Sequence, residues 1–412
     1  MQNDLFAENL NSLFSLRAPE LRFHDDEVHY GTIIDDNENA IHTFPILEYE
    51  ERYLSQDDSE SYTHISICTY GQLKEVARTK SSELFDSRFF TSRYGNKPFA
   101  SFTKHSWKIF FKTIKVMLPE IEQKVIYRYS GWSKDLDKYL FGKLLVDANS
   151  ALTIESTLVK ADTLLSDKTE SDVCKTVNDI FANLTSSKLI GYTLLMYLFL
   201  SHIKQRFITA HRLGPEFVLA IIGGTGSYKT STSMATFNTY DTTVSSFEDS
   251  LASIRRIFQA NKSGVTIVDD YKTSSKSLDA KLEKIVRLSG DVQTTGKYVV
   301  GNKVFDELVT GMSVITGERR PQLQQSSYSR ILFADLENSP INLEVLTELQ
   351  SSKAEINSFI VLFIQFILQN PRFDDEFIAL FQQHRDQLMT DPNYKGMHGR
   401  YYSMYGWLAA MW

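Results

Sequence analysis

Continuous apolar runs mark the middle of the chain. Residues 217–222 form a run without a polar position, which is typical of a strand buried on both faces of a parallel sheet. Mostly apolar runs also occur at 265–268, 308–315 and 331–334. Because segments that can form helices separate these runs, the pattern predicts an α/β core, with a parallel sheet flanked by helices.

The segments before this core have other patterns. Short alternating strands such as residues 63–68 and an aromatic-rich helical segment at 101–118 predict a separate N-terminal α+β domain over residues 1–150. Helical spacing then predicts a helical collar over residues 151–212. Its apolar run at 189–200 is too short to span a bilayer and is expected to be a buried helix.

The core itself is predicted to run from 213 to 340, and a helical lid is predicted over residues 341–412. Within the lid, residues 356–368 form a very apolar helical pattern that should stop before Pro371. The chain ends at Trp412 in an apolar stretch without a polar tail. We therefore expect the parent protein to continue beyond this residue.

A phosphate-binding loop is predicted between the first core strand and the next helical segment. The loop fits the pattern G-x-x-x-x-G-K-[ST] except at Tyr228, where a glycine is expected. Such a loop wraps backbone N–H groups around a triphosphate at the positive end of a helix. Lys229 would reach the β and γ phosphates, and the Thr230 hydroxyl would ligate Mg²⁺. The predicted ATP-binding residues are Gly223, Gly224, Thr225, Gly226, Ser227, Tyr228, Lys229 and Thr230.

Tyr228 departs from the loop pattern, so its conformation is predicted separately. Its side chain should point away from the phosphates, and its backbone should keep a conformation open to residues other than glycine. Gly223, Gly224 and Gly226 would then absorb the tighter bends. The alternative is a degenerate loop that binds no nucleotide.

A second motif follows at residues 265–270, a β-branched strand that ends in two carboxylates. This is a Walker B pattern. Asp269 would hold Mg²⁺ through its water shell, and Asp270 would polarise the attacking water. The alternative, a strand whose acidic end merely starts a turn, is disfavoured by the phosphate-binding loop that precedes it.

Two further residues complete the predicted catalytic set. Thr316 ends the apolar run at 308–315 and could sense the γ phosphate from the tip of a neighbouring strand. Arg330 precedes the run at 331–334, at a strand edge, and is expected to reach the nucleotide of the next subunit as an arginine finger. The alternative is an ordinary surface ion pair. The rival candidates for the finger are Arg319 and Arg320.

Composition limits the class of protein. A chain of 412 residues, with 42% hydrophobic and 23% charged residues, is typical of two or three globular domains. The N-terminus lacks a signal-peptide pattern, and Cys68 and Cys174 lack metal-like spacing, so we expect a soluble, cytoplasmic protein without membrane association. The formal net charge of -7 argues against nonspecific coating of nucleic acid. It leaves room for a local basic channel.

Several motifs together resemble those of the AAA+ replicative helicases of bacterial mobile elements and phage satellites. That family is similar to minichromosome-maintenance (MCM-like) motors and to viral superfamily 3 helicases. The resemblance covers about residues 125–340 and does not extend to the first 120 residues. The motifs are the loop Gly223–Thr230, Ser246–Ser253 leading to Val268-Asp269-Asp270, Leu288–Asp291, Val314–Glu318, and the earlier Ser130-Gly131-Trp132.

The resemblance implies a hexameric ring that hydrolyses ATP with Mg²⁺ at its subunit interfaces. Such a ring would move on single-stranded or forked DNA during replication of the element, with a replication initiator or a primase as a further partner. Two residues depart from the family pattern: Tyr228 in the loop, and Asp270, where many AAA+ proteins have a glutamate.

A β-hairpin is predicted around Gly301-Asn302, because two alternating runs flank this pair. In several ring helicases a hairpin at this place grips DNA in the pore. By that resemblance Lys303, near the tip, would contact nucleic acid together with Lys297 and Tyr298. The alternative is a solvent-exposed hairpin whose charges protect its edge.

An aromatic cluster in the N-terminal domain has two interpretations. Its rings could stack on bases beside the neighbouring cations, or they could be core residues flanked by solvated charges. The aromatic residues are Phe89, Phe90, Tyr94 and Phe99, and the cations are Arg88, Arg93 and Lys97.

Three functions remain open from the sequence. The favoured one is a DNA-translocating ATPase, based on the loop, the paired aspartates and the hairpin. The second is a nucleotide-gated oligomeric ATPase, an assembly or phage-defence protein that unwinds no strand, and the acidic net charge favours it. The third is a non-enzymatic scaffold with a vestigial loop, supported by Tyr228 alone.

Overall fold

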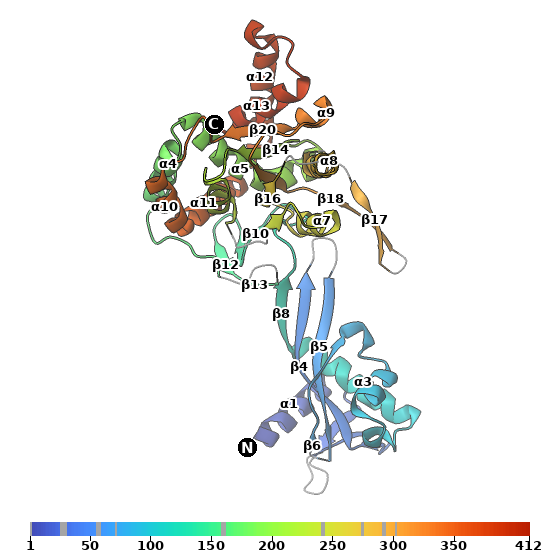
Figure 1. Cartoon of the computed structure of the whole chain (residues 1–412). Coiled ribbons are helices and arrows are strands. Elements are labelled where there is room, and N and C mark those ends of the chain that lie inside the picture. The colour runs from blue at the N-terminus through green and yellow to red at the C-terminus, as the bar shows by residue number, and fades with distance from the viewer. Residues whose placement is uncertain are drawn as a thin grey trace. The chain divides into compact units, whose positions relative to one another are not determined.

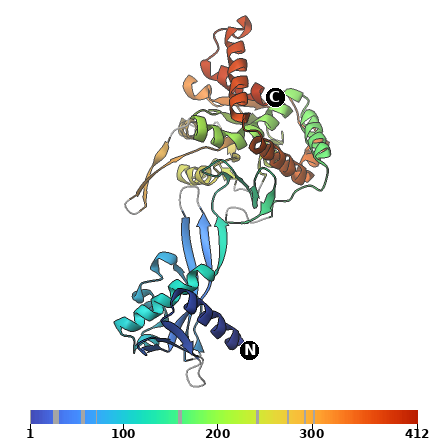
Figure 2. The same cartoon turned by 180° about the vertical axis from the view of Figure 1, so that it is seen from behind.

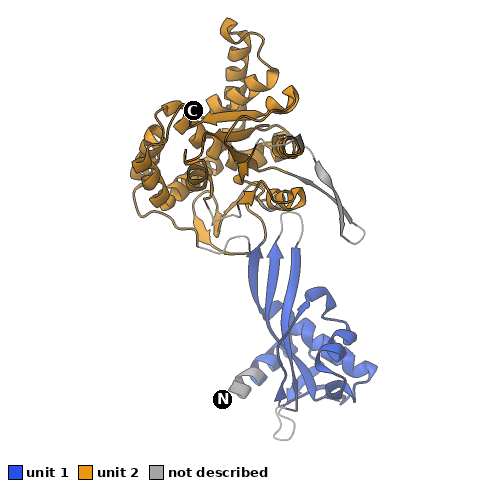
Figure 3. Ribbon diagram, in the orientation of Figure 1, with its two compact units in different colours: residues 1–127 blue, residues 128–412 orange. Residues whose placement is uncertain are grey.

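The computed structural model describes residues 2–24, 31–54, 59–70, 72–157, 162–239, 244–272, 276–290, 294–300 and 303–412. The chain divides into two compact units, residues 1–127 and 128–412 (Figure 3). The boundary therefore lies earlier than the predicted boundary at residue 150. The reason is that Trp132, Tyr139 and Phe141 are fully buried in the core of the second unit.

The first unit combines an antiparallel β-hairpin with helices packed on it. The hairpin strands β4 (Thr43–Leu54) and β5 (Ser59–Thr69) pair along most of their length (Figure 1). Helix α3 (Lys104–Met117) begins at a capping box made by Thr103 and Ser106, and its apolar face belongs to the core of this unit. The predicted strand at 63–68 and helix at 101–118 are thus confirmed.

The other elements of the first unit are helix α1 and a set of short strands and helices. Strand β8 pairs in parallel with β4, and β6 and β7 both pair with β5. These elements are α1 (Gln2–Arg17), β1 (Leu21–His24), β2 (Thr32–Asp35), β3 (Ala40–Ile41), β6 (Gln72–Leu73), β7 (Ala77–Lys80), η1 (Ser81–Glu83), α2 (Ser87–Tyr94), η2 (Lys97–Phe99), η3 (Leu118–Glu120) and β8 (Glu122–Tyr127).

The second unit is built on a parallel sheet of five described strands. Their order is β15-β16-β19-β14-β20, and every neighbouring pair is parallel. The predicted parallel core sheet is therefore confirmed. The strands are β14 (Val218–Ile222), β15 (Ser245–Ser246), β16 (Val265–Tyr271), β19 (Met312–Gly317) and β20 (Ile331–Asp335).

Helices cover both faces of this sheet, which explains its continuous apolar strands. Alternate residues of a strand point to opposite faces. Leu219 and Ile221 accordingly pack in a core with α5 (Lys188–His211) and α6 (Lys229–Phe237). Val218, Ala220 and Ile222 pack instead in a second core with α7 (Leu251–Ala260) and α8 (Lys276–Gly290).

Helix α5 confirms the predicted buried helix at 189–200 and continues with four buried polar residues, Ser201, His202, Lys204 and Gln205. Lys204 Nζ donates to the carbonyl oxygens of Ser289 at 2.7 Å and Gly311 at 3.2 Å. Gln205 Oε1 and the carbonyl oxygen of His202 accept from the two N–H groups of Trp132. These bonds satisfy polar groups that would be costly to bury alone.

The C-terminal helices belong to the same unit and pack against α4 (Glu170–Asn183) and α5, as Figure 2 shows from behind. The helix predicted at 356–368 is confirmed as α11 (Lys353–Gln369), which ends before Pro371. No single described helix is long and apolar enough to cross a membrane. Helices α10 and α11 pass that test only as a pair, bent by 67°.

The remaining elements of the second unit include the predicted hairpin. Strands β17 (Thr294–Val300) and β18 (Lys303–Leu308) pair antiparallel, which confirms its backbone, whereas residues 301 and 302 lie outside the described residues. The other elements are β9 (Gly131–Trp132), β10 (Tyr139–Phe141), β11 (Leu144–Val146), β12 (Ala151–Thr153), β13 (Glu155–Ser156), α9 (Gln325–Tyr328), α10 (Leu343–Ser351), α12 (Phe373–Thr390), η4 (Pro392–Tyr394) and α13 (Gly399–Met411).

Acid should weaken this fold through His202. Burial lowers the pKa of His202 from 6.5 to about 3, and its Nε2 has no hydrogen-bond partner among the described residues. Below about pH 6.5 the unfolded chain binds a proton that the folded chain excludes, so stability from this residue is present above that pH. It falls by about 1.4 kcal/mol per pH unit towards the folded pKa.

The measurement is urea unfolding of the wild type and of His202→Gln at about pH 7 and about pH 5. Gln does not titrate, and its side-chain oxygen can still accept from the Tyr139 hydroxyl, which lies 2.6 Å from His202 Nδ1. We expect the wild type to lose more stability than the variant on acidification. Equal losses would show that His202 does not contribute.

Candidate nucleotide site

The loop that the sequence predicts to bind phosphate lies between the predicted strand and helix. Residues 223–228 connect the end of β14 to the start of α6. The Gly223 N–H donates to the Gly317 carbonyl oxygen at 3.2 Å, which ties the loop to β19. The Tyr228 carbonyl oxygen accepts from the Thr232 N–H at 2.8 Å and begins the helix. The strand and the helix predicted on either side of the loop are both confirmed.

The prediction for the backbone conformation of Tyr228 was wrong. Tyr228 has φ 59° and ψ 24°, the left-handed conformation that favours glycine, and its side chain is 47% exposed. Gly226 also has a positive φ of 84°, but Gly223 and Gly224 do not. The neighbouring glycines therefore do not allow Tyr228 to avoid the left-handed conformation. The tyrosine itself adopts the conformation of the missing glycine, at a cost of about 1–3 kcal/mol.

Lys229 opens helix α6, and its side chain folds over the loop. Its Nζ donates to the carbonyl oxygens of Gly223 at 2.8 Å and Gly224 at 2.9 Å, and it lies 3.4 Å from Ser227 Oγ. The ammonium group and the helix N-terminus therefore place positive charge on the same loop. This arrangement suits an anionic ligand.

Asp269 joins three elements at the carboxyl ends of the strands. Its Oδ1 accepts from Thr230 Oγ1 of α6 at 2.9 Å and also from Thr316 Oγ1 of β19. Strand β19 lies between β14 and β16, so Thr316 stands between the loop and Asp269. The structure thus brings the three predicted residues together.

The oxygen atoms of this cluster suit Mg²⁺, which prefers hydroxyl, carboxylate and phosphate oxygens. Thr230 Oγ1 and Asp269 Oδ1 lie 2.9 Å apart, so a hydroxyl and a carboxylate face the same place. The described residues contain no group of three or more His, Cys, Asp or Glu side chains that could hold a metal. A metal bound here would need further oxygen ligands from outside the protein, such as phosphate and water oxygens.

Asp270 has a different environment. It lies at a bulge in β16 with φ 67°, and its N–H donates to Thr316 Oγ1 at 3.0 Å. Its carboxylate pairs with Lys272 Nζ at 2.8 Å, and both side chains are more than half exposed. The hydrogen bond from Lys272 to Asp270 raises the pKa of this lysine. The sequence analysis did not identify Lys272.

Glu318 is a second residue of the site to which the sequence analysis assigned no role. Its Oε1 accepts from Thr225 Oγ1 of the phosphate-binding loop at 2.8 Å. Glu318 lies in the bend directly after β19, so strand alternation does not indicate the side on which it lies. The contact with the loop could not be read from spacing.

Arg330 directly precedes β20, which is an edge strand of the sheet, as predicted. Its side chain is only 7% exposed, and Nη1 donates to the carbonyl oxygen of Ser326. Its role as an arginine finger stays a prediction. Arg319 and Arg320 are exposed, although Arg320 lies 3.8 Å from Asp335 and over the Phe333 ring.

The predicted nucleic-acid residues lie on the hairpin strands. Lys297 and Tyr298 belong to β17, and Lys303 is the first residue of β18, opposite Val300. Their side chains lie outside the described residues, so their DNA-binding role stays a prediction.

The aromatic cluster of the first unit is not a stacking surface. Phe90 and Phe99 are buried in the core, and Tyr94 packs against it. Burial raises the pKa of Tyr94 to about 12. Of the cations, Arg93 and Lys97 line a pocket of about 310 Å³ that also includes Lys74.

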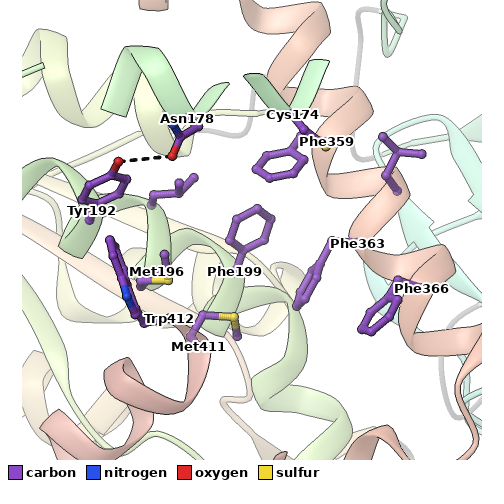
Figure 4. Close-up of a pocket in the computed structure, with 12 residues that line it drawn as sticks. Cys174, Asn178, Tyr192, Met196, Phe199, Phe359, Phe363, Phe366, Met411 and Trp412 are labelled. Atoms are coloured by element: carbon purple, nitrogen blue, oxygen red, sulfur yellow. Dashed lines mark hydrogen bonds between the residues drawn. The ribbon is translucent and has the colours of Figure 1, made fainter. Parts of the chain in front are cut away.

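An apolar pocket of about 500 Å³ lies among helices α4, α5, α11 and α13 (Figure 4). Figure 4 shows aromatic rings around it, and the Tyr192 hydroxyl donates to Asn178 Oδ1 at 3.2 Å. Its lining includes no residue of the phosphate-binding loop or of the strand-end cluster. It is therefore separate from the candidate nucleotide site.

The whole chain shares its fold with a solved helicase structure, described as "SCCmec type IV Cch - active helicase". The two have a TM-score of 0.55 and 11% sequence identity, over 94% of this chain and 72% of that chain. No protein-family model matches the chain, and no curated protein matches its sequence.

Two other solved structures have lower scores. "The A form apo structure of NrS-1 C terminal region-CTR(305-718)" has a TM-score of 0.28 and 8% identity, over 79% of this chain and 74% of that chain. "The X-ray structure of JCV Helicase" has a TM-score of 0.26 and 11% identity, over 68% of this chain and 73% of that chain. Scores this low do not establish a common fold.

Substitutions at Tyr228 should reveal the strain in the loop. Gly adopts a positive φ freely, whereas a β-branched residue is a genuine outlier there. We expect Tyr228→Val to be less stable than Tyr228→Gly by about 1–3 kcal/mol in urea unfolding. At Tyr53, an extended position in β4, the same two substitutions should rank in the opposite order. The same order at both positions would argue against the left-handed conformation.

Proposed function

We propose that this protein is an AAA+ P-loop ATPase that moves on DNA. The observation that carries the proposal is the hydrogen-bonded set Thr230, Asp269 and Thr316, placed beside a lysine-containing loop at a helix N-terminus. Phosphoryl transfer requires mainly the positioning of phosphates, metal and water, and this arrangement provides groups for the first two. The shared fold with a helicase structure supports the proposal.

The proposed roles follow from the positions. The N–H groups of residues 223–228 and the Lys229 ammonium would bind the β and γ phosphates. Thr230 would ligate Mg²⁺ directly, and Asp269 would hold it through water. When bound, Mg²⁺ would neutralise charge that develops on the phosphate oxygens. Thr316 would sense the γ phosphate, and Asp270 is the sequence-based candidate to polarise the water.

The wider proposal is a hexameric ring that works in replication of a mobile element in the cytoplasm, with an initiator or primase as partner. It rests on the family resemblance of the motifs. Because Arg330 is buried, exposed Arg319 and Arg320 should be tested beside it for a contact with the next subunit's nucleotide. The β17–β18 hairpin would contact the strand in the pore.

A second candidate is a nucleotide-gated oligomeric ATPase, for assembly or phage defence, that does not unwind DNA. The formal net charge of -7 favours it, because acidic proteins attract nucleic acid poorly except through a local basic surface.

ATP hydrolysis tests the proposed reaction. With Mg²⁺, the wild type should hydrolyse ATP faster when single-stranded DNA is present. Lys229→Ala and Asp269→Asn should each lower turnover by at least about 100-fold, because each removes a charge that holds the phosphates or the metal. ATP turnover that does not change when single-stranded DNA is added would favour the second candidate. Intact turnover in Lys229→Ala, or no turnover in the wild type, would contradict the proposal.

DNA binding tests the hairpin. The double variant Lys297→Ala/Lys303→Ala removes two cations and should weaken single-stranded DNA binding by about tenfold. Its affinity should also depend less steeply on salt concentration, because fewer phosphates are neutralised by the protein. The matched control is Lys188→Ala/Lys395→Ala, which removes two exposed lysines elsewhere. Equal effects of the two double variants would show that the hairpin lysines act only through net charge.

A further inference from the structure

Two carboxylates flank Asp269 at the strand ends, and their partners differ. The Asp270 carboxylate pairs with the Lys272 ammonium at 2.8 Å. The Glu318 carboxylate instead accepts a hydrogen bond from Thr225 Oγ1, a neutral hydroxyl in the phosphate-binding loop. The two carboxylates are therefore held by different groups: Asp270 by an ammonium group outside the loop, and Glu318 by a hydroxyl of the loop itself.

The direction of Glu318 places it on the phosphate side. Thr316 points towards the loop, since its hydroxyl donates to the carboxylate that also accepts from Thr230. Glu318 stands two residues later, in the bend that follows β19. Its contact with Thr225 shows that the carboxylate reaches the loop itself.

Asp270 has a different set of bonds. Its N–H donates to Thr316 Oγ1, and its φ of 67° follows a break in the register with β19. Its side chain is engaged by Lys272. The residue thus bonds to Thr316 through its backbone, while its carboxylate forms an exposed ion pair with Lys272.

We propose that Glu318, rather than Asp270, orients and activates the water that attacks ATP. This inference rests on the proposed ATPase function. A lone pair of the water oxygen forms a bond to the γ phosphorus, and the bond from that phosphorus to the β,γ-bridging oxygen breaks. ADP leaves with the electron pair of that bond. The proton of the water passes to the Glu318 carboxylate and then to solvent.

Thr225 is the positioning residue in this scheme. Its hydroxyl holds one carboxylate oxygen of Glu318, which leaves the other oxygen able to accept from water. Removal of the hydroxyl should make the carboxylate less well placed without removing it.

The experiment measures single-turnover hydrolysis of Mg²⁺-ATP and the Kd of a fluorescent ATP analogue for the full chain. Loss of a general base typically costs 10²–10⁴-fold, so Glu318→Gln should slow hydrolysis by about 100-fold or more. The Kd should stay within about threefold, since the group acts on the water. Asp270→Asn should slow hydrolysis by about tenfold or less.

Two further variants test the position of the carboxylate. Thr225→Val should slow hydrolysis by about five- to tenfold, and Thr225→Ser, which keeps the hydroxyl, should restore it. Glu348→Gln makes the same chemical change at an exposed position in α10 and is the matched control. It should hydrolyse ATP like the wild type.

Several outcomes would overturn the inference. If Asp270→Asn lowered the hydrolysis rate more than Glu318→Gln, Asp270 would be the residue that activates the water. A Glu318→Gln variant that hydrolyses ATP normally, or that fails to bind the analogue, would show a structural contact only. A wild type that binds no nucleotide or hydrolyses none would instead remove the proposed function, which separates the two failures.

Discussion

The structure of the second unit depends on burying both faces of a parallel sheet. Helices α5 and α6 cover one face, and α7 and α8 cover the other, so both faces are mostly apolar. The buried polar side chains Thr266 and Ser313 are each hydrogen-bonded. Polar chemistry is then confined to the ends of the strands, which in a parallel sheet lie at one edge. This constraint places Asp269 and Thr316 beside the loop that follows β14.

Helix α5 shows how the same constraint applies to a buried helix. Its last turns carry polar side chains that are shielded from water, and His202, Lys204 and Gln205 bond to groups outside the helix. Lys204 binds the carbonyl oxygens of Ser289 and Gly311, the residues that lie on either side of the β17–β18 hairpin in the chain. A buried lysine thus bonds to the chain on both sides of the hairpin that is proposed to contact DNA.

The candidate site also carries backbone strain. Tyr228 and Asp270 both have a positive φ, although neither is glycine. Residues in this conformation persist where their surroundings hold them, and they gather at functional sites. In this chain one lies at the start of α6 and the other at the end of β16, on either side of the Thr230–Asp269 bond.

The sequence by itself determined the strands, the buried helix, the hairpin backbone and the set Lys229, Thr230, Asp269 and Thr316. Apolar periodicity and short motifs are local, and local patterns are what a sequence displays. Only the tertiary structure decided that Arg330 is buried, that Tyr228 adopts the left-handed conformation, and that Glu318 contacts Thr225. It also decided that the first unit ends at Tyr127. Each of these depends on contacts between segments that are far apart in the sequence, and residue spacing along the chain does not indicate such contacts.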